Sequence, residues 1–73
     1  MMTDKIRVDA RGVLSPQPAE KVKKVLNGLS GGLVEVLVST ATARENVIRS
    51  GRHYGWKASF EETEDGYRVI LAR

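Results

Sequence analysis

A short run of residues near the N-terminus, D-A-R-G-V-L-S-P-Q-P, combines a side chain that could do chemistry with residues that shape a loop. Ser15 is well placed as the N-cap of a helix, because Pro16 then occupies the first helical position, where a missing N–H costs nothing. Pro18 is less ordinary, since at the third helical position it removes one backbone N–H that an N-cap oxygen usually accepts from. We interpret this loop as shaped for a function besides stability.

The elements on both sides of the loop follow from the spacing of apolar residues. Alternating polar and apolar residues predict a strand at Lys5–Asp9, and the nearly all-apolar segment Leu33–Val38 predicts a second strand. Between them, a helix from about Pro16 to Leu29 has its apolar residues three or four positions apart, and the glycines at 28, 31 and 32 end it.

The second half of the chain predicts one more helix and two more strands. A second helix is predicted from about Ala43 to Tyr54, with Thr42 and Glu45 as a capping box. A third strand starts near Trp56, Asp65-Gly66 forms a hairpin turn, and a fourth strand follows it. The expected core includes residues from both helices and two strands: Trp56, Phe60, Val36, Val25, Leu26 and Val47.

These elements define the expected fold class. The order β-α-β-α-β-β predicts an α/β (α+β) two-layer sandwich, with a mixed four-stranded sheet and both helices on one face. The first two strands should be parallel, because a helix joins them, and the last two should form an antiparallel hairpin. Residues 1–73 should form a single domain, because a chain of this length holds no more than one.

The parallel pair places the loop at a particular edge of the sheet. Carboxyl ends of parallel strands and the helices that follow them meet at one edge, so Ser15 and Thr42 should lie there together. Two positive helix ends and the nearby Arg11 would favour a negative charge on a small side chain at position 15. A cysteine at that position would therefore have a lowered pKa and an exposed thiolate.

Composition excludes several other functions. The chain has no cysteine and a single histidine, His53, so we expect neither a metal site nor a bound cofactor. No apolar run is long enough to span a membrane and nothing resembles a signal peptide, so we expect a cytoplasmic monomer. Although the formal net charge is +3, the charge is spread along the chain and no exposed aromatic platform is expected, which argues against direct nucleic-acid binding. An acidic protein partner suits the predicted basic docking residues better: Lys21, Lys23, Lys24, Arg49 and Arg52.

The loop resembles the signature of a known family. In the TusA or SirA-like small sulfur-carrier proteins the loop and helix start read Asp-x-x-Gly-x-x-Cys-Pro-x-Pro, and Asp9, Gly12, Pro16 and Pro18 match this motif in register. The resemblance continues through the segments KVKKVL, VEVLV and ARENV and covers essentially the whole chain. It implies the same two-layer sandwich. It also implies protein partners, namely a cysteine desulfurase and the acceptors of its sulfur in tRNA thiolation, cofactor synthesis or sulfur metabolism.

This sequence departs from the family at the central position. The resemblance makes Ser15 the carrier position, and it assigns the shaping of the loop to Asp9, Arg11, Gly12, Pro16, Gln17 and Pro18. Family members hold sulfur as a persulfide on the cysteine that Ser15 replaces. A hydroxyl is far too weakly acidic for that chemistry, so we do not expect this chain to be an active sulfurtransferase. Two explanations are open, a Cys-to-Ser variant or an inactive relative, and the alternative is a non-catalytic protein-binding or regulatory module that uses the same edge.

Overall fold

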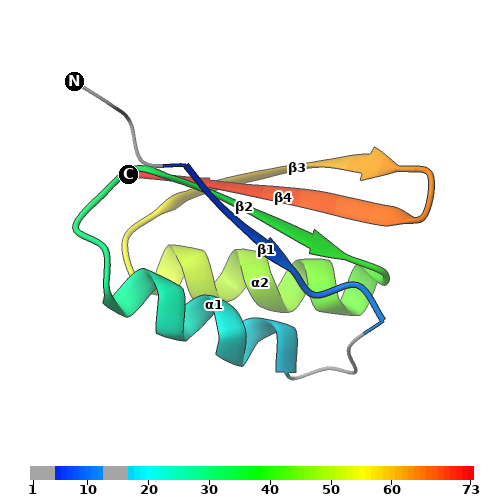
Figure 1. The fold of residues 1–73 in the computed structure, drawn as a ribbon, viewed down its shortest axis with the longest axis horizontal. Coiled ribbons are helices and arrows are strands. Elements are labelled where there is room, and N and C mark those ends of the chain that lie inside the picture. The colour runs from blue at the N-terminus through cyan, green and yellow to red at the C-terminus, as the bar shows by residue number, and fades with distance from the viewer. Residues whose placement is uncertain (1–4, 13–16) are drawn as a thin grey trace.

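The computed structural model describes residues 5–12 and 17–73, and places two helices against a four-stranded sheet (Figure 1). The loop residues Ser15 and Pro16 lie outside the described residues. Along the chain the elements are β1 (Lys5–Asp9), α1 (Gln17–Asn27), β2 (Leu33–Val38), α2 (Ala41–His53), β3 (Lys57–Thr63) and β4 (Gly66–Ala72). The predicted order β-α-β-α-β-β is confirmed.

The sheet is mixed, with the strand order β1-β2-β4-β3. Strand β1 pairs with β2 in parallel, whereas β4 pairs antiparallel with both β2 and β3. Both helices cover the same face of the sheet, as predicted, and none of the described elements covers the opposite face, which we call the open face (Figure 1). Within the described residues, no helix is long and apolar enough to cross a membrane.

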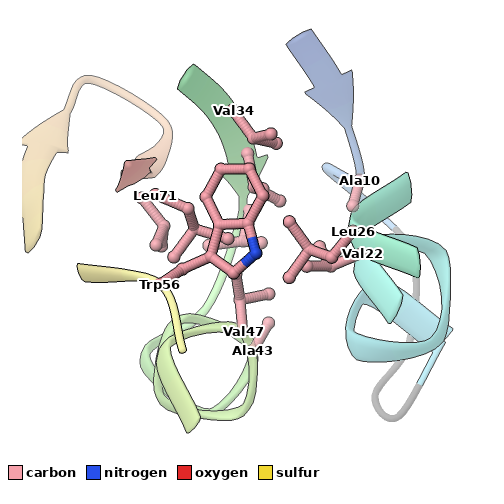
Figure 2. Packing of buried hydrophobic residues seen from close by; sticks show 11 residues of the cluster. Ala10, Val22, Leu26, Val34, Ala43, Val47, Trp56 and Leu71 are labelled. Atoms are coloured by element: carbon pink, nitrogen blue, oxygen red, sulfur yellow. The ribbon is translucent and has the colours of Figure 1, made fainter. Parts of the chain in front are cut away.

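The core lies between the sheet and the two helices. The indole of Trp56 is only 3% exposed and lies at the centre of this layer, between side chains of α1, α2 and the sheet (Figure 2). The other buried apolar side chains around it are Ala10, Val22, Leu26, Val34, Val36, Val38, Ala43, Val47, Val69 and Leu71. The predicted core positions Trp56, Val36, Leu26 and Val47 are confirmed, and Val25 packs against the cluster while partly exposed.

The predicted burial of Phe60 is wrong. Its side chain is 42% exposed, because β3 is an edge strand and alternation fixes only the face of the sheet on which a residue lies. The Arg44 guanidinium lies 4.3 Å from the centroid of the Phe60 ring, and Tyr67 contacts that ring edge-on at 6.1 Å. Phe60 therefore completes an aromatic and cationic cluster at the rim of the core. The expectation of no exposed aromatic platform assumed that Phe60 is buried, and that assumption is wrong.

The predicted start of α2 also needs correction. Thr40, not Thr42, is the N-cap, because its backbone is extended and its hydroxyl oxygen accepts the Ala43 N–H at 3.1 Å. The helix therefore begins at Ala41, and Glu45 pairs with Arg44 instead of completing a capping box.

The hairpin turn lies one residue earlier than predicted. Glu64 and Asp65 form the two-residue turn, and Gly66 is already the first residue of β4. Gly66 has a φ of 155°, and a Cβ atom there would collide with the carbonyl oxygen of Val38. The glycine thus permits β4 to start directly against the end of β2.

Candidate functional site

Three connections meet at the carboxyl edge of the parallel strands. The β1–α1 loop leaves from Asp9, the β2–α2 connection leaves from Val38, and the β3–β4 turn lies beside them (Figure 1). The Gly12 N–H donates a hydrogen bond of 2.8 Å to the hydroxyl of Ser39, which ties the first loop to the second. Gly12 has a φ of 77°, a left-handed conformation that explains a glycine at this position. The predicted meeting of the two loops at one edge is confirmed.

Arg11 ties the first loop to the third connection. Its guanidinium donates to both carboxylate oxygens of Asp9, with Nε–Oδ1 at 3.0 Å and Nη2–Oδ2 at 2.8 Å. Its Nη1 atom donates to Asp65 Oδ2 at 3.2 Å, across 54 positions of sequence. The side-chain bonds from Arg11 to Asp9, together with the Arg11 N–H that donates to Asp9 Oδ1 at 3.1 Å, lower the pKa of Asp9 to about 2. The same carboxylates raise the pKa of Arg11, which therefore remains charged.

The pairing of Arg11 changes the electrostatics expected at this edge. Asp9 and Asp65 together carry two negative charges against the single positive charge of Arg11, so its field on neighbouring groups is offset. The N-termini of α1 and α2, which both lie at this edge, add positive potential there (Figure 1). Support for a negative charge at position 15 would thus come from the helices more than from Arg11.

The structure brings together some of the predicted site residues and adds two others. Asp9, Arg11 and Gly12 form one connected group, and the backbone of Gln17 and Pro18 begins α1 two residues after position 15. Ser39 and Asp65 belong to the same group, although sequence reasoning did not single them out as site residues. The pairing of β4 with the end of β2 is the signal that could have found Asp65, because it brings the hairpin turn to this edge.

The five predicted docking residues lie in the two helices. Their side chains, Lys21, Lys23, Lys24, Arg49 and Arg52, are all exposed. Lys23 and Arg49 line a groove between the two helices, together with Ser50 and His53.

A further charged cluster lies on the open face, around Glu35. The Glu35 side chain is only 7% exposed, and its Oε1 atom lies 2.7 Å from Lys5 Nζ. Arg68 Nε lies 3.4 Å and Arg7 Nη2 lies 3.9 Å from Oε2 of the same carboxylate. The hydrogen bond from Lys5 and the nearby guanidinium groups keep the pKa of Glu35 below its usual range. This cluster joins β1, β2 and β4. The sequence showed Glu35 only as an interruption of an apolar strand.

The described residues offer no metal centre. Across 5–12 and 17–73, no group of three or more His, Asp or Glu side chains converges as a metal ion would require.

Comparisons with known proteins agree with this architecture. A family model described as Sulfurtransferase TusA matches residues 6–73. The crystal structure of a SirA-like protein from Desulfitobacterium hafniense is 31% identical, covers 92% of this chain and 95% of its own, and superposes with a TM-score of 0.86. No curated protein matches the chain. Because the family match spans nearly all of the sequence and the fold agrees, this chain belongs to the TusA/SirA-like family.

Proposed function

We propose that this chain is a docking domain of a sulfur relay whose carrier position is inert. It forms one domain over residues 1–73 and offers the carboxyl edge to the family's protein partners, but it holds no sulfur. The observation that carries this proposal is a contrast at that edge. Asp9, Arg11 and Gly12 are held in a connected group with Ser39 and Asp65, whereas residue 15 has a hydroxyl where the family has a thiol.

The chemistry of persulfide transfer explains why the hydroxyl is inert. In a sulfur carrier, a thiolate attacks the outer sulfur of a donor persulfide, a new S–S bond forms, the old one breaks, and the donor leaves as a thiolate. A serine hydroxyl is not ionised near neutral pH, and it cannot form the persulfide that stores the sulfur. Serine and cysteine are close in size, so the substitution should leave the shape of the docking edge intact.

The proposal implies a set of partners and a place of action. The partners are a cysteine desulfurase and the proteins that accept its sulfur, in tRNA thiolation, cofactor synthesis or sulfur metabolism. Lys21, Lys23, Lys24, Arg49 and Arg52 would add long-range attraction to acidic surfaces of these partners. The chain would act in the cytoplasm as a monomer.

One observation favours a second candidate, a regulatory module unrelated to sulfur. Two carboxylates offset the positive charge of Arg11. The edge therefore stabilises a thiolate less than it would with an unpaired guanidinium. In that case Ser15 would act only as a helix cap, and the edge would bind a partner outside any sulfur relay.

Intact mass after incubation with a cysteine desulfurase and free cysteine separates the two candidates. We expect the unmodified chain to bind the desulfurase without gaining mass, and the S15C variant to gain one sulfur atom. The unmodified chain should also slow loading of the S15C variant by competing for the same surface. If neither chain binds the desulfurase and S15C gains no sulfur, the relay proposal is wrong and the regulatory module is favoured.

A further inference from the structure

A groove between the two helices gathers nitrogen-bearing side chains away from the carboxyl edge. Helices α1 and α2 lie side by side beneath the sheet and start at the same end of the molecule (Figure 1). Lys23 of α1 and Arg49, Ser50 and His53 of α2 line a groove of about 240 Å³ between them. None of these residues belongs to the group formed by Asp9, Arg11 and Gly12, so the groove is a separate feature.

The two cations of this groove have no carboxylate partner in the described part of the chain, whereas several other cations do. Arg11, Arg44 and Arg68 each lie within 4.0 Å of a carboxylate oxygen. In the part of the chain that the structure describes, no acidic side chain lies within ion-pair distance of Lys23 or Arg49. Two positive charges therefore face one groove without a counterion from the described chain, which leaves their attraction available to an external anion.

The side-chain chemistry indicates which anion would fit. Arg49 offers a planar fork of N–H donors, and Lys23 offers a compact ammonium group, a pairing that suits the oxygens of a phosphate group. Ser50, only 8% exposed, also lines the groove and carries a hydroxyl, and the imidazole of His53 can donate an N–H.

From this arrangement we propose that the α1–α2 groove binds a phosphate-type oxyanion. The guanidinium of Arg49 and the ammonium of Lys23 neutralise the charge, while Ser50 and His53 donate hydrogen bonds to the remaining oxygens. This site does not depend on sulfur transfer, because it uses none of the carboxyl-edge residues.

Titration of isotope-labelled protein with potassium phosphate, followed by NMR, tests this site directly. Potassium chloride at matched ionic strength is the reference, because it screens charge without offering a tetrahedral oxyanion. We expect saturable shifts that concentrate on the backbone amides of Lys23, Arg49 and Ser50 and on the imidazole of His53. A change as large with chloride as with phosphate would overturn the proposal.

A matched pair of variants distinguishes a built site from general attraction. Arg49→Gln removes a groove cation, whereas Arg52→Gln removes an exposed cation of the same helix that does not line the groove. We expect Arg49→Gln to weaken phosphate binding about tenfold, the scale of a lost charge-assisted hydrogen bond, and Arg52→Gln by about twofold or less. Lys23→Gln and Lys24→Gln form a second pair on α1, and far-UV circular dichroism checks that all four variants fold.

Two outcomes would contradict the proposal. Equal weakening by Arg49→Gln and Arg52→Gln would mean diffuse charge attraction without a site. Binding of a short oligoribonucleotide at these residues, with no saturable response to inorganic phosphate, would mean that the groove contributes to a nucleic-acid surface and does not bind a small oxyanion. The sulfur gain of the S15C variant is unaffected by either result, because it depends on the thiol at position 15.

Discussion

Asp9 shows how a single side chain links the loop to the sheet. It is the last residue of β1, and Arg11 holds its carboxylate by side-chain and backbone hydrogen bonds although both side chains are exposed. Asp65 holds the opposite side of the same guanidinium. The conformation at the start of the loop therefore depends on a carboxylate that must be ionised to accept these bonds.

This dependence predicts how stability changes with pH. The pKa of Asp9 is about 2 in the folded chain and near 3.8 when unperturbed, so the unfolded state binds a proton first as pH falls. The contribution of Asp9 is fully present above about pH 4 and is lost as the pH falls through about 2. We expect the urea midpoint of the unmodified chain to fall over this range and Asp9→Asn to show a shallower fall. Glu64→Gln, in the exposed turn, serves as the control, and equal slopes for Asp9→Asn and the unmodified chain would contradict the prediction.

Ser15 allows a second prediction at the scale of one residue. The thiol of an S15C variant should have a pKa below the ordinary value of about 8.5, because α1 starts two residues later and α2 starts at the same edge. Adding Asp65→Asn should lower it further, since Arg11 would then share its charge with one carboxylate instead of two. The rate of alkylation measured against pH gives both values. An apparent pKa at or above the ordinary value would show that the edge does not support a thiolate.

The start of α2 gives a prediction at the scale of an element. Thr40 accepts the Ala43 N–H, whereas Thr42 is exposed within the first turn. We therefore expect Thr40→Ala to lower the free energy of unfolding by about 1 kcal/mol and Thr42→Ala by about half of that or less. Urea unfolding of the two variants measures both changes. A larger loss of unfolding free energy for Thr42→Ala would contradict this assignment and support the predicted capping box of Thr42 and Glu45.

This pair of threonines illustrates what the sequence can and cannot predict. The periods of apolar residues identify all six elements, and the helix between the first two strands identifies their parallel pairing. Both Thr40 and Thr42 are acceptable caps by residue type, so only the backbone conformation distinguishes them. The ion pair between Arg11 and Asp65 is not visible in local patterns either, because it depends on the order of strands in the sheet.

Phe60 and Val36 extend this comparison to the whole molecule. Both lie on the helix-facing side of the sheet, but Val36 is in an inner strand with no exposed surface, whereas Phe60 is in the edge strand β3. Alternation identifies the face on which each lies, and the position of each strand across the sheet then decides how deeply each side chain is buried. That position depends on β4 pairing between β2 and β3, which no local signal encodes.

Because Val36 is buried and Phe60 is partly exposed, the loss of stability in their alanine variants should not simply follow the size of the side chain removed. Val36→Ala should lower the free energy of unfolding by roughly 1–3 kcal/mol, because it leaves space in a close-packed core. Phe60→Ala removes a larger side chain but should cost less than a buried phenylalanine, for which about 3–5 kcal/mol is usual. Urea unfolding of the two variants at one pH provides the comparison. A midpoint unchanged by Val36→Ala would contradict the complete burial of Val36 in the core.

The strand order also has a consequence for how the molecule is assembled during synthesis. Strand β3 pairs only with β4, and β4 also pairs with the edge of β2 opposite β1. Yet β4 is the last of the six described elements to be synthesised. Until β4 emerges, the apolar strand β2 has one unpaired edge and β3 has no partner in the sheet. An unpaired apolar edge can pair with other chains, so the nascent chain is most prone to aggregate before β4 is available.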